Sequence, residues 1–263
     1  MATDERETSL SGGLSNIGKV VRVDDTVRRP WGAHSPAVHA LLSHLESVGF
    51  DGAPRFLGRD EQGRAVLSFV EGDVGVPPFP AWVADEALLD SVAALHRRFH
   101  DAVRGFSLPP GMVWDTTLAG DPARATLVGH NDLCVENVVV RDGRAVAFID
   151  FDFAGPADPL WDVAIALRHW APVRGTIDLE PTRAHLDRIA RFDRYCVVYG
   201  VAADDRAVLV DLLGAFLDQA LVKVRERALA GQAGYVDWWA AGYEGQNRRA
   251  HEWVKINRSQ LIG

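Results

Sequence analysis

Two polar residues stand at the ends of a predicted β-hairpin, where they could hold a metal ion. Apolar, β-rich runs at 138–140 and 145–149 flank Asp142-Gly143, a strong signal for a tight turn. Asn137 precedes the first run and Asp150 follows the second. Because a short turn joins antiparallel strands, we expect these two residues to lie close together at one end of the ribbon. An amide oxygen and a carboxylate are suitable ligands for a hard cation such as Mg²⁺.

Further polar residues lie beside this pair in the chain. Asp132 comes five residues before Asn137, and Asp152 comes two residues after Asp150. Any one of these residues is equally at home in an ordinary turn, because Asn and Asp cap turns and helices in many proteins. The prediction of a site therefore rests on the whole ordered set and its spacing.

The ordered set resembles the motifs of one enzyme family. His130-Asn131-Asp132 to Asn137, followed by Ile149-Asp150-Phe151-Asp152, is similar to the phosphotransferase branch of the protein-kinase-like fold, which includes aminoglycoside and choline kinases. The resemblance implies that Asp132 orients the acceptor hydroxyl or takes its proton, and that Asn137 and Asp150 bind Mg²⁺. It also implies supporting residues at His130, Asp152 and Asp162, the last bracing the catalytic loop from a following helix.

The resemblance further implies an α+β, bilobal fold. A small antiparallel sheet with one helix would form the N-terminal nucleotide-binding lobe, residues 1–72, and a larger, mainly helical lobe would span 73–263. The hinge would lie at 68–72, where backbone groups of Ser68, Phe69 and Val70 would bind the purine edge. Apolar residues recur with helical spacing at 84–103, 160–170, 181–199, 204–230 and 235–258.

A glycine-rich hairpin near the N-terminus is the predicted flap over the nucleotide phosphates. Its candidate contacts are Gly12, Gly13, Ser15 and Asn16, since glycine-rich backbone can present N–H groups to anions. Residues 13–19 also spell G-x-x-x-x-G-K, but Val20 follows where a P-loop needs Ser or Thr, and a strand pattern replaces the required helix. We therefore exclude a P-loop. A purely structural hairpin is the alternative for this stretch.

The resemblance also implies a cation for the phosphates at the end of the next strand. Arg28 is the preferred contact because it follows the apolar run, whereas Arg29 precedes Pro30 and could face solvent. The helix at 35–45 is predicted to begin with Ser35 as its N-cap. Where the family has a Glu that holds the cation, this helix has Val38 or His39. Either the ion pair or the alignment of the helix therefore departs from the family pattern.

The composition excludes several classes of partner. The formal net charge of −8 argues against a nucleic-acid partner and favours cationic small molecules. The two cysteines, Cys134 and Cys196, cannot form a disulfide framework. The N-terminus is charged, and no apolar run approaches membrane-spanning length. We therefore expect a cytoplasmic protein that binds neither nucleic acid nor membranes.

By resemblance, the helical C-terminal region builds the acceptor pocket. Carboxylates and indole faces bind cationic amines well. The candidate contacts of these two kinds are Trp161, Asp193, Asp218, Glu226 and Trp238. The alternative for each is an ordinary role, because acidic residues on helices are usually solvated and tryptophans usually pack in the interior.

These observations predict a Mg²⁺-dependent phosphotransferase that uses ATP or GTP and acts on a hydroxyl of a small, cationic molecule. Asn131 and Asp152 favour a choline- or amino-alcohol-kinase-like enzyme, whereas the chain length and the run 155–159 favour an aminoglycoside-phosphotransferase-like one. The missing helix Glu motivates a second hypothesis, a degenerate kinase that binds nucleotide or a metabolite without transfer. The sequence leaves the oligomeric state open.

Overall fold

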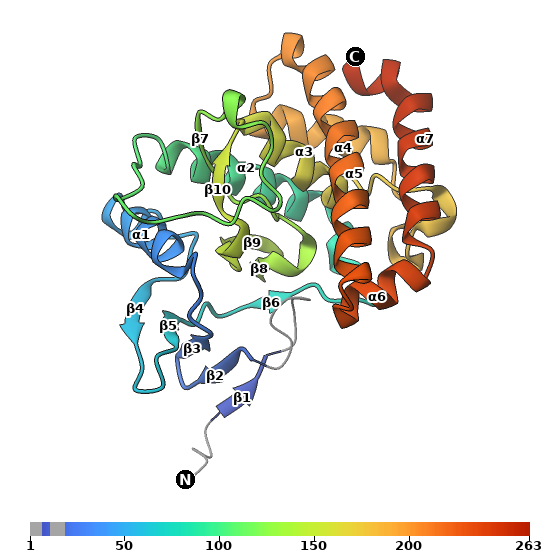
Figure 1. The fold of residues 1–263 in the computed structure, drawn as a ribbon. Coiled ribbons are helices and arrows are strands. Elements are labelled where there is room, and N and C mark those ends of the chain that lie inside the picture. The colour runs from blue at the N-terminus through green and yellow to red at the C-terminus, as the bar shows by residue number, and fades with distance from the viewer. Residues whose placement is uncertain (1–6, 11–18) are drawn as a thin grey trace.

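The structure is a computed structural model that describes residues 7–10 and 19–263. Its N-terminal part is an antiparallel sheet with strand order β1-β2-β3-β5-β4 (Figure 1). The strands are β1 (Glu7–Ser9), β2 (Val21–Val23), β3 (Thr26–Arg29), β4 (Phe56–Arg59) and β5 (Ala65–Ser68). β3 pairs with β5 so that Arg29 lies opposite Ala65. This register places Arg29 at the last paired position of β3.

One helix, α1 (Ser35–Ser47), accompanies this sheet. Its buried residues Ala37, Val38, Leu41, Leu42 and Leu45 recur at intervals of three and four, so they form one apolar face. The predicted N-cap is wrong by one residue. His34 is the N-cap, and Ser35 Oγ instead accepts a hydrogen bond from the backbone N–H of Gly32 at 2.9 Å.

The predicted hairpin is present and lies in a second sheet. β8 (Val138–Arg141) pairs with β9 (Arg144–Phe148) around Asp142 and Gly143, which both have positive φ. β8 also pairs with β6 (Asp73–Val74). The chain reaches β6 through Gly72, where a Cβ atom would lie 2.6 Å from the Val140 carbonyl oxygen, so only glycine fits there. A separate two-stranded sheet joins β7 (Leu127–Gly129) to β10 (Gly155–Ala157).

The rest of the second part is helical (Figure 1). Its helices are α2 (Glu86–Ala102), α3 (Pro159–Trp170), α4 (Arg188–Tyr199), α5 (Arg206–Leu229), α6 (Ala233–Ala240) and α7 (Tyr243–Ile262). The helix expected at 181–199 starts later, because residues 181–183 form a separate 3-10 turn and Asp187 caps α4. The helix expected at 235–258 is two helices, divided at Gly242 with φ 84°. The α+β architecture is otherwise as predicted.

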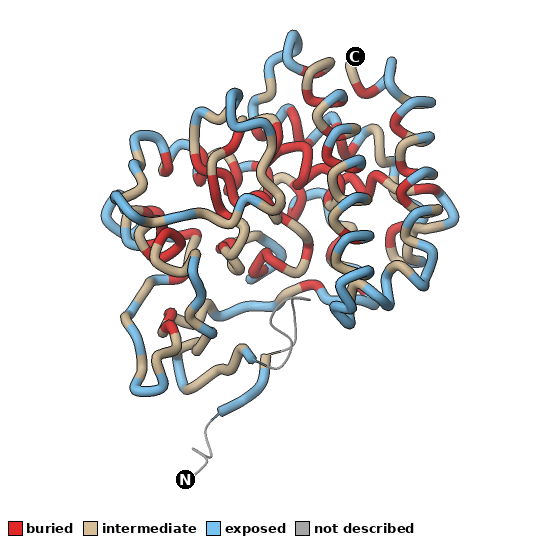
Figure 2. Tube along the Cα trace, in the orientation of Figure 1, coloured by how far each residue is buried: buried red, intermediate tan, exposed pale blue. Residues whose placement is uncertain are grey.

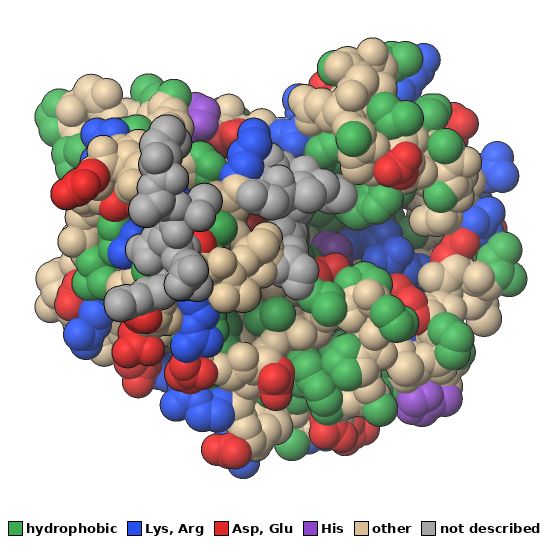
Figure 3. Space-filling view, turned by 90° about the horizontal axis from the view of Figure 1, so that it is seen from below, with side chains coloured by type: hydrophobic (Ala, Val, Ile, Leu, Met, Phe, Trp, Pro, Cys, Tyr) green, Lys and Arg blue, Asp and Glu red, His purple; other side chains and the backbone are tan. Residues whose placement is uncertain are grey.

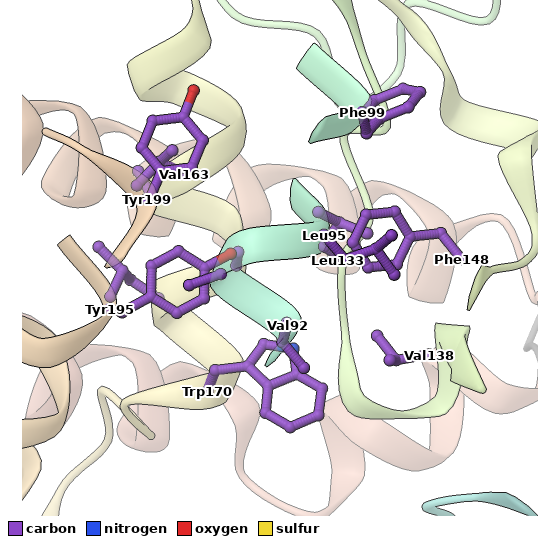
Figure 4. Close-up of a cluster of buried hydrophobic side chains, with 14 of the residues drawn as sticks. Val92, Leu95, Phe99, Leu133, Val138, Phe148, Val163, Trp170, Tyr195 and Tyr199 are labelled. Carbon is purple, nitrogen blue, oxygen red and sulfur yellow. The ribbon is translucent and has the colours of Figure 1, made fainter. Parts of the chain in front are cut away.

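The main core lies in this second part, where buried segments gather around α2, α3 and the hairpin (Figure 2). Val92, Leu95 and Phe99 of α2 lie close to Phe148 of β9 and Leu133 (Figure 4). All of these side chains are at most 3% exposed. Close packing against α2 therefore supports the hairpin. This packing fixes the position of the polar residues that flank its strands. Within the described residues, no helix is long and apolar enough to cross a membrane.

Candidate active site

The catalytic-loop candidates lie between β7 and β8. Asn137 donates hydrogen bonds from Nδ2 to Asp132 Oδ2 at 3.0 Å and to the Asp132 carbonyl oxygen at 2.8 Å. These bonds engage the amide nitrogen, so the amide oxygen of Asn137 is the atom left to bind a cation. The structure thus brings the predicted base and one predicted metal ligand into direct contact.

The two ends of the hairpin meet, as the sequence predicts. Ile149 donates its N–H to the Asn137 carbonyl at 2.9 Å, which places Asp150 next to Asn137. His130 Nε2 donates to the Ile149 carbonyl at 2.9 Å and so ties the loop to the end of β9. Asp150 has φ 62°, a left-handed conformation that turns the chain sharply at the end of the strand. The donors offered here, an amide oxygen and carboxylate oxygens, fit Mg²⁺.

β3 supplies a cation to this group. Arg29 donates from Nη2 to Asp150 Oδ1 and to Asp152 Oδ2, both at 2.7 Å. Arg28 faces the other way, with its Nε 3.6 Å from Asp60 Oδ2. Successive residues of a strand point to opposite faces of the sheet, so only one of the two arginines can reach the hairpin. The residue at the site is therefore Arg29 rather than the expected Arg28.

α1 presents a histidine to Arg29 where the family pattern has a Glu. The ring of His39 stacks on Phe56 with centroids 4.0 Å apart, and His39 is 7% exposed. Burial, and then the positive charge of Arg29, lower the pKa of His39 to about 4. The imidazole is therefore neutral at pH 7 and forms no ion pair. Arg29 is held instead by Asp150 and Asp152 on the other side of the site.

Asp162 on α3 braces the catalytic loop from behind. Its two carboxylate oxygens accept the backbone N–H groups of His130 and Asn131, each at 2.8 Å. Asp162 Oδ2 also lies 3.2 Å from His96 Nε2 and 3.0 Å from His100 Nε2. The resemblance implied the role of Asp162, whereas the two histidines of α2 were not among the predicted site residues.

The histidine pair is fully hydrogen-bonded without a metal ion. His96 Nδ1 lies 2.8 Å from the Tyr195 hydroxyl, and His100 Nδ1 lies 2.6 Å from the Tyr199 hydroxyl. With both hydroxyls donating to Nδ1, both Nε2–H groups donate to Asp162, and every polar atom is satisfied. Burial by itself raises the pKa of Asp162, but the hydrogen bonds from His100 and His96 bring it well below the usual range. The loop therefore rests on a buried carboxylate that stays charged.

The two acidic residues at the centre of the site have different pKa values. Burial and then the charge of Asp150 raise the pKa of Asp132 well above its usual range. Burial also acts to raise the pKa of Asp150, but the charge and hydrogen bond of Arg29 outweigh it and lower that pKa. One group is thus suited to take up a proton and the other to stay ionised.

Comparisons with known proteins agree with this geometry. A sequence profile of the phosphotransferase enzyme family matches residues 104–197, which include the catalytic loop, the hairpin and Asp162. A trifolitoxin immunity protein from Rhizobium leguminosarum bv. trifolii is 30% identical over 264 residues, covering 97% of this chain and 97% of that protein. The chain belongs to the phosphotransferase enzyme family.

Solved structures show that this phosphotransferase family member has the kinase-like fold. A choline/ethanolamine kinase family protein from Mesorhizobium loti superposes with a TM-score of 0.65 at 15% identity, covering 98% of this chain and 92% of that one. The GDP complex of an aminoglycoside 2'-phosphotransferase-IIIa gives 0.59 at 17% identity, with 95% and 93% covered. At these identities the likeness establishes the fold alone. It confirms the predicted bilobal, α+β class.

The predicted nucleotide contacts of this phosphotransferase family member are only partly described. Gly12, Gly13, Ser15 and Asn16 lie outside the described residues. At the hinge, Ser68 donates its N–H to the Arg55 carbonyl and Phe69 donates its N–H to the Asp25 carbonyl, at 2.9 and 2.8 Å. Those two donors are engaged within the protein. Val70 is the remaining hinge residue of the three predicted to contact the purine.

Each acidic residue among the predicted acceptor contacts lies beside a basic residue. Asp193 pairs with Arg206 at 2.8 Å, Asp218 with His251 at 3.0 Å, and Glu226 with Lys223 at 3.4 Å. The two tryptophans differ in burial, since Trp238 is 46% exposed. Trp161 is 4% exposed and meets Phe216 edge to face, and Trp238 stacks on Tyr243. The carboxylates that suggested a cationic acceptor are thus each paired with a basic neighbour on the helices.

Proposed function

We propose that this chain is a Mg²⁺-dependent phosphotransferase that moves the γ-phosphate of ATP or GTP to a hydroxyl group of a small molecule. The observation that carries the proposal is the meeting of Asp132, Asn137 and Asp150 at one end of the β8–β9 hairpin, with Arg29 facing them. Phosphoryl transfer depends mainly on positioning and on charge stabilisation. Oxygen ligands, a base and a permanent cation in one place meet those needs.

Each residue has a distinct part in this proposal. Asp132 orients the acceptor hydroxyl and takes its proton, and its raised pKa favours that uptake. Asn137 holds the Asp132 carboxylate in place through Nδ2. Arg29 exchanges its carboxylate partners for phosphate oxygens, because its guanidinium group suits either. A Mg²⁺ ion held by Asn137 and Asp150 would neutralise the charge of the phosphate oxygens.

The nucleotide is proposed to lie between the two lobes, residues 1–72 and 73–263. Val70 of the hinge would contact the purine, and Gly12, Gly13, Ser15 and Asn16 would cover the phosphates. Similar solved structures are described as complexes with GDP, and with AMP-PNP and Ca²⁺. They support a nucleotide and metal site here and leave both ATP and GTP as candidates.

The similarity to an immunity protein suggests which classes of acceptor to test. The similarity to a trifolitoxin immunity protein extends over 97% of both chains. An antimicrobial compound that is inactivated by phosphorylation is therefore one class of acceptor to test. Aminoglycosides and amino alcohols are two more, because structures of kinases for such molecules have similar folds.

The test combines nucleotide binding with turnover. Release of ADP or GDP is measured with Mg²⁺ across aminoglycosides, amino alcohols and hydroxy acids, for the wild type, Asp132→Asn and Asp142→Asn. Asp142 is an acidic residue in the turn at the opposite end of the same hairpin, so it is the matched control. We expect acceptor-dependent release that Asp132→Asn abolishes and Asp142→Asn preserves, with Mg-nucleotide binding retained in both variants.

Two results would contradict the proposal. One is a wild-type protein that binds no Mg-nucleotide, and the other is turnover that survives Asp132→Asn. Mg-nucleotide binding without turnover on any acceptor would instead favour the degenerate kinase. The neutral His39 beside Arg29 is the observation that keeps this second function under test.

A further inference from the structure

Three buried or half-buried arginines lie in the last turn of α3 and in the segment that follows it. They are Arg168 on the helix, Arg174 in the loop after it and Arg183 in the following 3-10 turn, and we call them the arginine cluster. Arg168 is 6% exposed and Arg183 is 2% exposed. Burial, and then the charge of Arg174, lower the pKa of Arg168 to about 9. These side chains are therefore close enough to repel one another.

The cluster carries more positive than negative charge. Glu180 pairs with Arg183 at 2.7 Å and is the carboxylate in closest contact with the cluster among the described residues. Arg183 also lies within electrostatic reach of Glu136. His169 adds no charge, because burial and the three arginines lower its pKa well below 6.5. A buried excess of cations is costly unless an anion compensates it.

Several donors in and next to the arginine cluster have no acceptor. Arg168 Nη1, Arg174 Nε and Thr182 Oγ1 are buried, and none has a hydrogen-bond partner among the described residues. Nearly all buried donors in folded proteins are paired, so a group of unpaired donors next to excess positive charge requires an explanation. An oxyanion would accept these hydrogen bonds and compensate the charge at once.

One member of the cluster, Arg168, lies on the same helix that holds the catalytic loop. Asp162 binds the loop near the start of α3, and Arg168 is six residues further along, which is about 9 Å at the rise of an α-helix. Glu136, whose charge acts on Arg183, immediately precedes Asn137. Seen from below, the surface is hollowed, and basic and histidine side chains show in the depth of the hollow (Figure 3). Arg168 and the residue that braces the catalytic loop are thus less than two turns apart on one helix.

We propose that the acceptor carries an oxyanion group, a carboxylate or a phosphate, which binds Arg168 and Arg174 while its hydroxyl faces Asp132. This inference rests on the proposed phosphotransferase function and replaces the cationic acceptor expected from the sequence. The carboxylates that would bind a cation are paired elsewhere on the helices, whereas these arginines have unused donors. Guanidinium groups bind carboxylates and phosphates with the same paired geometry.

The first test measures anion binding without turnover. Malonate or inorganic phosphate is added at constant ionic strength, with Mg-ADP present, and the melting temperature of the wild type, Arg168→Met and Arg194→Met is recorded. Arg194 is a surface arginine that pairs with Asp90 and Glu86, so it is the matched control. We expect at least one anion to raise the melting temperature of the wild type and of Arg194→Met but not of Arg168→Met. Which anion does so distinguishes carboxylate from phosphate.

The second test uses acceptors that differ by the anionic group. Serine is compared with ethanolamine, and glycerol 3-phosphate with glycerol. Arg168→Met should raise the KM of the anionic member roughly 10- to 100-fold and leave its partner nearly unchanged, because a charged hydrogen-bonded contact is lost. If Arg168→Met fails to fold, Arg174→Met takes its place in both tests.

The outcomes separate this inference from the proposed function. No anion effect in the wild type, or an equal effect in Arg168→Met, would overturn the oxyanion site even if Mg-nucleotide binds and turns over. Preference for ethanolamine or glycerol would overturn it as well. Failure of Mg-nucleotide binding, with the anion effect intact, would count against the phosphotransferase alone.

Discussion

Arg29 and Asp150 are 121 residues apart in the chain, yet Arg29 Nη2 lies 2.7 Å from Asp150 Oδ1. The pair joins the N-terminal sheet to the end of the catalytic hairpin. Its side chains are 13% and 28% exposed, so their attraction is less screened by water than that of a surface pair. This contact identifies which residue of β3 faces the site.

Replacing Arg29 should impair phosphate handling far more than replacing Arg28. Arg29→Met removes the cation that faces Asp150, and we expect kcat/KM for the nucleotide to fall about 100-fold, the usual scale for loss of one electrostatic contact to a reacting group. Arg28→Met, on the same strand but paired with Asp60, should have little effect. Steady-state kinetics on both variants measure the difference, and equal losses would contradict the assignment.

Removing the carboxylate of Asp162 should destabilise the fold as well as the site. Asp162→Asn keeps the shape but removes the charge that four buried donors share. We expect the free energy of unfolding to fall by about 3–5 kcal/mol, as for other broken buried charge networks. Asp193→Asn, which breaks the more exposed pair with Arg206, should cost no more than about 1 kcal/mol. Urea denaturation compares the two variants, and similar losses would argue against a brace.

Stability should decline as the pH falls from 6.5 toward 4. The pKa of His39 is lowered from 6.5 to about 4 by burial and then by Arg29, and the pKa of His96 is lowered to about 4 by burial and then by His100. Between these values the unfolded chain binds a proton that the folded protein does not. The stability from the neutral imidazoles is therefore complete above pH 6.5 and lost progressively below it.

The contribution of His39 to this pH dependence can be isolated. His39→Gln removes one titrating group, so the slope of the free energy of unfolding against pH should be smaller by up to about 1.4 kcal/mol per pH unit in this range. Urea denaturation at pH 7.5, 6, 5 and 4.5 gives the slope for both proteins. An unchanged slope would mean that His39 is not held neutral.

Two glycines should respond to alanine in opposite directions. A Cβ atom at Gly214, within α5, meets nothing within 4 Å, so Gly214→Ala should stabilise the protein by about 0.5–1 kcal/mol through helix propensity. A Cβ atom at Gly120 would lie 2.8 Å from the ring of Trp161, which is buried and hydrogen-bonded to Leu118. Gly120→Ala should therefore destabilise by about 1–3 kcal/mol. Thermal melts of both variants measure these changes in stability. A stabilised Gly120→Ala would show that Trp161 can move.

The sequence determined the parts of the site that depend on local geometry. A tight turn at Asp142-Gly143 forces the two strands to run antiparallel, so Asn137 and Asp150 had to meet. Asp132 is close in the chain and lies within the same loop. The antiparallel sheet, the single early helix and the helical second part also followed from periodicity and from the family motif.

Only the tertiary structure decided the contacts between distant segments. Arg28 and Arg29 are neighbouring residues of the same type. The pairing of β3 with β5 determines which of the two side chains faces the site. The positions of the acidic helix residues depended on how the helices pack, which placed Asp193 and Asp218 beside basic partners. The arginine cluster is spread over a helix, a loop and a turn, and it exists only because the chain folds back on itself there. Contacts of this kind have no sequence period, because they arise from the packing of whole elements.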